Sequence, residues 1–301
     1  PYIVYKDACN AKSNQKFIGT IKSSNLCAEI VQYSDEKQFS CCTLASVGLP
    51  AFIEDGKFQF DKFRKTVHQV VRNLDRVIDL NYYPVERTTQ NNKEYRPLGI
   101  GVQGLVDVFQ ELQIPTDSKE ALELNERIFS HLYYAALESS CKLAEERGPH
   151  KDFDKSPAAQ GILSYDMWNH KPNPELNWQN LKDNIKQKGL RNSLLVACMP
   201  TASTSQILGN TECFEPPTSN IFTRRTLHGE FMVVNLRLMN KLKELGIWSS
   251  KLREKIVRNR GSIQGIKEIP KEVQQIYKTS WDLSQKTLID LAVGRSPYID
   301  Q

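Results

Sequence analysis

The sequence predicts an α/β protein, on three observations. Long segments carry apolar residues at three- and four-residue steps, the pattern of helices that bury one face. Short uninterrupted apolar runs also occur, as in strands that are covered on both sides. The two kinds of segment alternate along the chain, which is typical of α/β folds. No repeat or linker stands out, so we expect a single domain over residues 1–301.

The helices are predicted first, because their periodicity is strongest. Residues 61–80 repeat apolar side chains on one face, and Asp61 can cap that helix. A second helix is expected from Ser118 to Arg147, where Gly148 and a following proline end it. A third begins at Trp178 and stops near residue 189. Further helices are expected over 102–112, 236–245, 251–258 and 272–292.

The strands are predicted from shorter patterns. Residues 193–199 form a continuous apolar run, which is better explained by a buried strand than by a helix. A polar stretch rich in capping residues follows at 200–206 and predicts the start of a helix. Other short strands are expected at 25–31, 41–47 and 231–234.

The composition excludes several classes of protein. With 40% hydrophobic and 25% charged residues the chain is not intrinsically disordered, and no apolar run approaches the ~20 residues of a membrane helix. The net charge of +5 is a weak argument for nucleic-acid binding. Seven cysteines without a secretory signal fit a reducing, cytoplasmic compartment. Because the chain begins with Pro1, we expect processing or a piece of a longer protein.

Two motifs are misleading. Gly99, Gly101 and Gly104 fit the dinucleotide-binding pattern GxGxxG, but Pro97 argues against a central strand before them. We therefore expect these glycines to allow close packing of a helix that begins at Val102. The histidines are isolated and no CxxC occurs, so no zinc site is predicted.

Asn25, Cys27 and Glu29 form the first candidate site. In an extended segment, residues two apart share one face. There the carboxylate can take a proton, the amide can hold a hydroxyl, and the sulfur can do covalent or radical chemistry. Since a nearby carboxylate disfavours a thiolate, the trio favours a neutral thiol or a thiyl radical. The competing and more common interpretation is a buried structural cysteine beside two polar residues.

Cys41 and Cys42 follow about fifteen residues after Cys27. A hairpin would bring one of them back beside Cys27, where it is a candidate redox thiol. The competing interpretation is two small buried residues.

The stretch Thr201, Ala202, Ser203 and Thr204 is the third candidate. Free N–H groups and hydroxyls where a helix begins bind phosphate well. Simple capping by Ser203 or Thr204 explains the same residues.

Together these motifs resemble the large subunit of class I ribonucleotide reductase, most closely its eukaryotic and large-DNA-virus type. The likeness covers essentially the whole chain, with its motifs in the family's order. The matching stretches are Asn-Leu-Cys-Ala-Glu-Ile at 25–30, Cys-Thr-Leu-Ala-Ser at 42–46, Arg-Pro-Leu-Gly-Ile-Gly-Val-Gln-Gly-Leu at 96–105, and Pro-Thr-Ala-Ser-Thr at 200–204, continuing through 191–195, 206–210, 218–220 and 223–225.

The resemblance implies a fold. The catalytic domain of that family is a ten-stranded α/β barrel whose central finger loop carries a radical cysteine. Cys27 matches that cysteine. The chain would then supply the loop and the later half of the barrel, without the N-terminal regulatory region or the C-terminal tail.

The resemblance also implies a reaction, the reduction of ribonucleoside diphosphates to 2′-deoxyribonucleoside diphosphates for DNA precursor synthesis. Cys27 would become a thiyl radical and take the 3′ hydrogen, while Glu29 takes the 3′-hydroxyl proton and Asn25 binds the substrate. Cys42 matches one member of the redox-active cysteine pair. The diphosphate-binding turn is matched by Thr201, Ala202, Ser203 and Thr204.

The implied partners are several. A metal-containing small (beta) subunit would supply the radical, so no cofactor is expected to bind this chain directly. Thioredoxin or glutaredoxin would restore the thiols, ATP and dNTP effectors would bind outside this segment, and a homodimer is expected. Neither nucleic acid nor membrane is expected as a partner.

Some features depart from the family. Thr43 stands where relatives usually have Asn, and Cys41 is an additional thiol. The second redox cysteine, the tyrosine pair of the radical path and the C-terminal cysteines would lie outside 1–301, so the segment alone is expected to be inactive. Two alternatives stay open. One is a related radical reductase with a different cofactor, and the other is a degenerate homologue that only binds nucleotides or other proteins.

Overall fold

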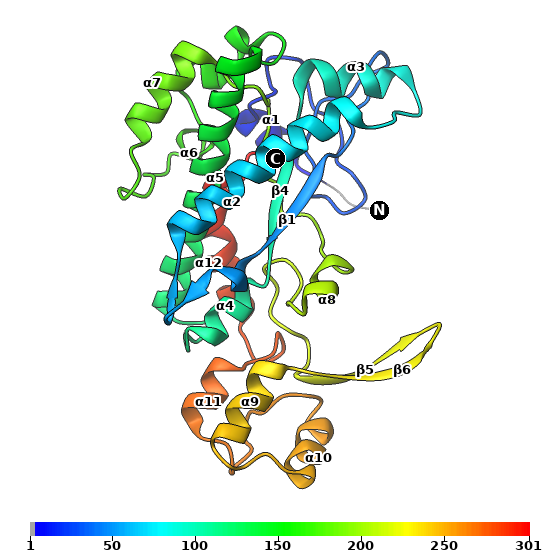
Figure 1. Ribbon diagram of the computed structural model, residues 1–301, viewed down its shortest axis with the longest axis vertical. Helices are drawn as coiled ribbons and strands as arrows, with labels where there is room; N and C mark the ends of the chain where they lie inside the picture. Colours follow the sequence, from blue (N-terminus) through cyan, green and yellow to red (C-terminus); the bar gives the residue numbers. More distant parts are fainter. Residues whose placement is uncertain (1–3) are drawn as a thin grey trace.

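Three parallel extended segments form the centre of the molecule in the computed structural model, which describes residues 4–301. Strand β1 (Leu44–Gly48) pairs with β4 (Gly99–Gln103) in parallel (Figure 1). Residues 193–199 lie along the other side of β4, joined by a parallel bridge between Ile100 and Val196. The predicted buried strand at 193–199 is thus confirmed as a buried extended segment, and the strand predicted at 41–47 begins later, at Leu44.

Strand β4 corrects the sequence interpretation of the glycine motif. The helix expected over 102–112 is instead the end of β4 followed by the shorter helix α4 (Leu105–Glu111). Pro97 lies just before β4, where its missing N–H interrupts no ladder hydrogen bond. A Cβ at Gly101 would lie 2.7 Å from the carbonyl oxygen of Ala197. The motif is glycine-rich because a neighbouring strand approaches closely.

Two long helices cover this sheet and confirm their predictions. Helix α5 (Lys119–Arg147) begins after Ser118, whose hydroxyl accepts the N–H of Ala121 at 3.1 Å. Helix α2 (Phe60–Leu80) packs along α5. The prediction that Asp61 caps α2 is wrong, because Asp61 lies inside the first turn and pairs with Arg64 at 2.6 Å.

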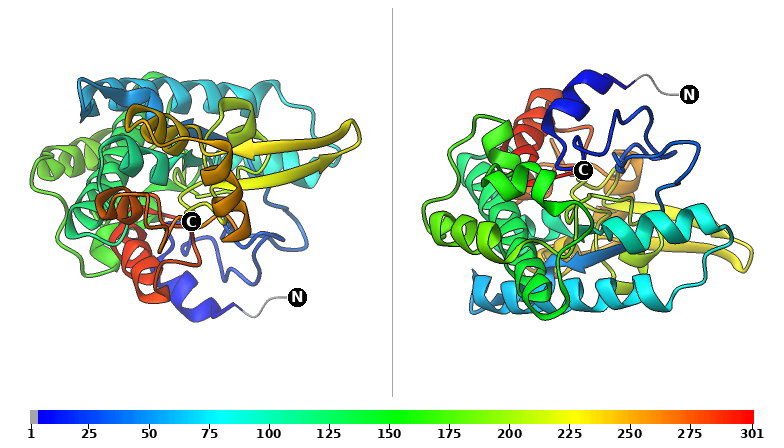
Figure 2. Two further views of the ribbon diagram at one scale, coloured as in Figure 1. Left: turned by 90° about the horizontal axis from the view of Figure 1, so that it is seen from below. Right: turned by 90° about the horizontal axis from the view of Figure 1, so that it is seen from above.

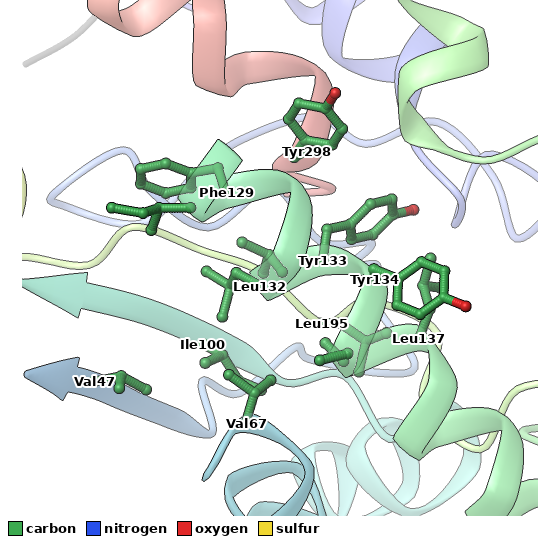
Figure 3. Close-up of a cluster of buried hydrophobic side chains, with 14 of the residues drawn as sticks. Val47, Val67, Ile100, Phe129, Leu132, Tyr133, Tyr134, Leu137, Leu195 and Tyr298 are labelled. Carbon is green, nitrogen blue, oxygen red and sulfur yellow. The ribbon is translucent and has the colours of Figure 1, made fainter. Parts of the chain in front are cut away.

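The main core lies between the sheet and these helices. In Figure 3, Val47 of β1, Ile100 of β4, Val67 of α2, Leu132 of α5 and Leu195 converge on one apolar cluster. Each is at most 6% exposed. Burying side chains of this size stabilises the fold by about 1.5–3 kcal/mol each, which fixes the sheet against the helices.

A buried ion-pair network anchors the start of β4. Arg96 is 3% exposed and its guanidinium contacts Asp75 at 2.7 Å and Asp79 at 2.8 Å, both on α2. The amide of Asn192 donates to Asp75 at 3.2 Å and to the Arg96 carbonyl at 3.0 Å. The network therefore joins α2, β4 and the 193–199 segment.

A second apolar cluster lies in the part of the chain from 221 to 277. It is built on helices α9 (Leu236–Glu244), α10 (Ser250–Arg258) and α11 (Lys271–Ile276). Strands β5 (Ile221–Thr226) and β6 (Gly229–Val234) form a hairpin that extends away from the body (Figures 1 and 2). The predicted helices at 236–245 and 251–258 and the strand at 231–234 are confirmed here.

The prediction of a single helix over 272–292 is wrong, because two helices occupy this range. Helix α11 ends at Ile276, and α12 (Gln285–Arg295) begins only after Ser284, which caps it by accepting the N–H of Thr287 at 3.1 Å. Between them, Asp282 accepts hydrogen bonds from both the N–H and the hydroxyl of Thr279. These side-chain bonds replace helical ones and interrupt the helix.

The remaining elements are shorter. The third predicted helix is α7 (Trp178–Lys188). Within residues 4–301, no helix has both the length and the apolar character needed to cross a membrane. The others are α1 (Lys6–Lys12), α3 (Glu86–Tyr95), α6 (Ser164–Met167), α8 (Thr204–Leu208) and a small hairpin of β2 (Ile53–Glu54) and β3 (Lys57–Phe58).

Candidate active site

The strand predicted at 25–31 is wrong, because this segment forms a turn. The N–H of Ala28 donates to the carbonyl of Asn25 at 3.1 Å, and Ala28 has a left-handed φ of 63°. The side-chain oxygen of Asn25 accepts the N–H of Ile30 at 3.0 Å. An asparagine that bonds its own backbone in this way favours a turn over a sheet ladder. The same-face argument for Asn25, Cys27 and Glu29 therefore does not hold.

The turn nevertheless exposes the groups that chemistry would use. Cys27 is exposed at its tip, next to Leu26, which is 82% exposed. The oxygen Oε2 of Glu29 is buried and has no hydrogen-bond partner within residues 4–301. An unpartnered buried carboxylate oxygen is costly, so it marks a group held ready for a ligand or a proton.

Cys42 lies close to this turn. Surrounding protein atoms raise the pKa of its thiol to about 11, chiefly by removing water, although the residue as a whole is exposed. The charges of Cys41, Glu29 and Cys27 raise that pKa further. Cys42 is therefore near enough to Glu29 and Cys27 for their charges to affect its thiol. Burial also raises the pKa of the Cys41 thiol.

The predicted phosphate turn at 201–204 lies beside strand β1, which follows Cys42 in the chain. The hydroxyl of Thr204 is 3.5 Å from that of Ser46 on β1. Cys42 precedes Ser46 by four residues, which is about 13 Å of extended chain. The thiol cluster and the turn thus lie along one strand.

The turn itself has free donors. Ala202, Ser203 and Thr204 donate no backbone N–H hydrogen bond to any other described residue. Ser203 occupies the capping position of α8, but its side chain makes no capping bond, so the capping interpretation is wrong for Ser203. Thr201 is buried, and its hydroxyl accepts the N–H of Cys213 at 2.7 Å.

Sequence reasoning missed two polar residues that support this turn. Gln103 is buried at the end of β4 and donates to the hydroxyl of Ser46 at 2.9 Å. Asn210 donates to the side-chain oxygen of Gln103 at 3.2 Å. The available signal is a polar residue at the end of an apolar strand, and the interpretation of the glycine motif as helix packing hides that signal.

The part of the chain from residue 4 onward contains no group of three or more His, Cys, Asp or Glu side chains arranged to hold a metal ion.

Comparison with known proteins identifies the family. Residues 1–301 match the family model described as ribonucleotide reductase, barrel domain. The chain belongs to this family. The resemblance noted from the motifs is thereby confirmed, and the mixed helix and strand content agrees with it.

Curated relatives support the assignment over the whole chain. The ribonucleoside-diphosphate reductase large chain of Schizosaccharomyces pombe is 53% identical over all 301 residues, which cover 37% of that relative. The large subunit of Monkeypox virus is also 53% identical, with 39% of it covered. The chain therefore spans less than two fifths of the length of these relatives.

A solved structure supports the fold. The alpha subunit of the class Id ribonucleotide reductase of Actinobacillus ureae superposes with a TM-score of 0.77 at 28% identity. The match covers 100% of this chain and 51% of that subunit.

Proposed function

We propose that this chain is the catalytic segment of a large subunit that reduces ribonucleoside diphosphates to 2′-deoxyribonucleoside diphosphates. The names and the identity of its relatives support this reaction class. The observation that carries the proposal is the cluster of Cys27, Glu29 and Cys42, with one carboxylate oxygen buried and unpartnered.

Each residue of the turn has a role in the proposal. Cys27, exposed at the tip, forms a thiyl radical and takes the 3′ hydrogen of the ribose. The free oxygen of Glu29 accepts the proton of the 3′-hydroxyl. Asn25 uses its side-chain oxygen within the turn, which leaves its Nδ2 group to donate to a substrate hydroxyl.

Cys42 acts as the proton donor to the leaving 2′-hydroxyl. Its raised pKa keeps the thiol protonated at neutral pH, as a donor requires. Water leaves, and Cys42 then forms a disulfide with a second redox thiol, which we propose lies upstream of residue 1. The two electrons of that thiol pair reduce the ribose.

The turn at 201–204 holds the diphosphate. Its free N–H groups and the exposed hydroxyls of Ser203 and Thr204 are the donors that phosphate oxygens accept. We further propose that β1, β4 and 193–199 are neighbouring strands of a ten-stranded barrel. The turn that carries Cys27 would be its finger loop, and residues 1–301 would form one incomplete catalytic domain.

The proposed partners follow from the reaction. A metal-containing small subunit generates the radical, no cofactor binds this chain directly, and thioredoxin or glutaredoxin reduces the disulfide. ATP and dNTP effectors act from outside this segment, and the large subunit forms a homodimer. The seven free cysteines support a reducing, cytoplasmic location.

The test is Cys27→Ser in the complete large-subunit polypeptide, assayed with its small subunit for reduction of cytidine diphosphate. We expect activity to fall to background, because an alcohol cannot replace the thiyl radical. Cys9→Ser on α1 is the matched control and should retain activity. Normal turnover by Cys27→Ser would overturn the assignment. Nucleotide binding without any reduction by the unmodified protein would instead favour a non-catalytic homologue.

A further inference from the structure

We infer that Gln103 is a positioning residue for the turn at 201–204. Its side-chain amide orients a chain of hydrogen bonds so that the hydroxyl of Thr204 presents its hydrogen to a phosphate oxygen. The inference rests on the proposed function, because it takes the bound group to be the diphosphate of the substrate. It adds a residue that acts on the substrate without touching it.

The first observation is where the amide of Gln103 lies. Gln103 is the last residue of β4 and is 1% exposed. Thr204 is the first residue of α8 and is exposed. The amide therefore acts on the turn from the protein interior, through hydroxyl groups that lie between it and the surface.

The second observation is the direction of the hydrogen bonds that the amide makes. The Nε2 group of Gln103 donates to the hydroxyl oxygen of Ser46 at 2.9 Å and to that of Thr204 at 3.5 Å. Its Oε1 atom accepts from the Nδ2 group of Asn210 at 3.2 Å. An amide carries hydrogens on its nitrogen and none on its oxygen. Asn210 therefore holds the Gln103 amide with its nitrogen toward the two hydroxyls.

The orientation of the amide sets the orientation of the hydroxyls. The Ser46 oxygen accepts from Gln103, so its single hydrogen is free to point at the Thr204 oxygen, 3.5 Å away. When the Thr204 oxygen accepts from both neighbours, its own hydrogen has no acceptor within residues 4–301. The chain thus runs from Asn210 through Gln103 and Ser46 to Thr204, and it leaves a donor at its exposed end. Hydrogen bonds in such a chain polarise one another, which strengthens the last donor.

An unused donor at this place fits an anionic acceptor. The backbone N–H groups of Ala202, Ser203 and Thr204 are also free among the described residues, so several donors lie in one turn. An ionised phosphate oxygen accepts hydrogen bonds and donates none, and its charge makes each bond stronger than a neutral one. Because every ribonucleoside diphosphate carries the same diphosphate, the contribution of Gln103 should not depend on the base.

The test is Gln103→Met in the complete large subunit, assayed with its small subunit on cytidine diphosphate and on adenosine diphosphate. Methionine keeps a similar length and removes the donor. We expect KM to rise about tenfold for both substrates with kcat unchanged, as when one hydrogen bond to a charged group is lost from the ground and transition states alike. Equal KM values for Gln103→Met and the unmodified protein would overturn the inference.

Gln110→Met is the matched control. Gln110 on α4 is also buried, and it also accepts from an asparagine, Asn235 at the start of α9, at 3.2 Å. The same substitution therefore removes a buried amide that orients no hydroxyl of the turn. KM for Gln110→Met should equal that of the unmodified protein, and a tenfold rise there would show that loss of any buried amide has this effect.

A double-mutant cycle tests whether Gln103 acts through Thr204. Thr204→Val removes the hydroxyl at an exposed position and should raise KM about tenfold by itself. In that background Gln103→Met should have little further effect, because the donor that it orients is already absent. Multiplication of the two effects would show that the residues act independently, and would overturn the inference. Circular dichroism confirms that each variant is folded.

Gln103→Glu reverses the chain. A carboxylate only accepts, so it takes the hydrogens of Ser46 and Thr204 and leaves no donor at the exposed end. KM should therefore rise further than in Gln103→Met, and an equal or lower value would overturn the inference. Calorimetric titration with inorganic pyrophosphate needs no turnover and should give the same order of affinities. Failure of these predictions would leave the reductase function standing, whereas absence of reduction by the unmodified protein would contradict that function.

Discussion

At the scale of single residues, Cys42 shows how neighbours set the chemistry of one thiol. Its sequence position between Cys41 and Thr43 says nothing about acidity. Removal of water, and to a lesser extent the charges of Cys41, Glu29 and Cys27, raise its pKa to about 11. A thiol in this state stays protonated at neutral pH and can donate a proton.

This pKa predicts a pH profile. Below its pKa, the thiolate fraction of Cys42 rises tenfold for each pH unit, so its alkylation by iodoacetamide should keep rising to about pH 11. Residue-resolved mass spectrometry measures the rate. Glu29→Gln removes a negative charge and should make Cys42 react faster at pH 9. A plateau near pH 9 in the unmodified chain would contradict the prediction.

Asp300 is a second residue whose environment decides its role. Its carboxylate is 7% exposed and accepts the N–H groups of Leu195 at 3.0 Å and Val196 at 2.7 Å. It thus satisfies donors of the 193–199 segment. Burial raises its pKa to about 7, because desolvation outweighs these hydrogen bonds.

The raised pKa of Asp300 predicts a pH-dependent stability. An acid whose pKa is higher in the folded than in the unfolded chain stabilises the fold most below about pH 4, and loses this contribution as pH rises to about 7. Relative to Asp300→Asn, the free energy of unfolding should fall by about 1.4 kcal/mol per pH unit in that window. Urea unfolding at several pH values measures it. A constant difference from pH 4 to 7 would refute the assigned pKa.

At the scale of elements, the sheet depends on close approach between β4 and the segment 193–199. Gly101 faces the carbonyl oxygen of Ala197, and Gly99 faces the side chains of Leu44 and Ala197. Small residues at these positions let three parallel segments pack with their backbones in contact. The site depends on this packing, because Gln103 at the end of β4 supports the turn at 201–204.

Gly101→Ala should therefore be strongly destabilising. Its Cβ would meet a backbone oxygen at 2.7 Å, and backbone in a central strand cannot move aside as a flexible side chain does. We expect a loss of about 3 kcal/mol in urea unfolding. Gly56→Ala is the comparison, since Gly56 has a φ of 69° but open space around it, and should lose only about 1 kcal/mol. Equal losses in the two variants would refute the contact argument.

At the scale of the whole molecule, the two apolar clusters are joined by polar contacts. Arg237 on α9 reaches Asp107 at 3.0 Å and Glu111 at 2.9 Å on α4. Lys278 pairs with Asp117 at 2.6 Å. Asp107 is buried, and desolvation raises its pKa, while Arg237 and the hydrogen bonds from Thr211 favour its charged form.

Removing this cation should loosen one cluster from the other. In Arg237→Met the carboxylate of Asp107 loses its cationic partner and keeps only the hydrogen bonds from Thr211, at a cost of about 3 kcal/mol. Amide hydrogen exchange in 236–258 should accelerate about 100-fold, while α5 stays protected. The control is Arg225→Met, whose ion pair with Glu230 on the hairpin is exposed and contributes little. Uniform acceleration across both clusters would show that they unfold as one unit.

The sequence by itself determined the long helices, the buried segment 193–199 and the family. Periodicity, the Ser118 cap and the Gly148 stop are local signals, which the residues concerned carry with them. The family followed from several motifs in a fixed order, and the comparisons confirmed it. Helix periodicity, helix ends and the order of motifs depend on residues that are close in the sequence or on their order along it, so they can be read from the sequence alone.

Only the tertiary structure decided the rest. From sequence alone, the glycines of β4 predict close packing of a helix, because the segment that needs them, 193–199, comes about a hundred residues later. The turn at 25–30 replaced an expected strand because the Asn25 side chain bonds the backbone locally. The contacts of Ser46 with Thr204 and with Gln103 join segments that are remote in sequence. Hydrophobic patterns do not encode such contacts, because they report which face is buried and not what covers it.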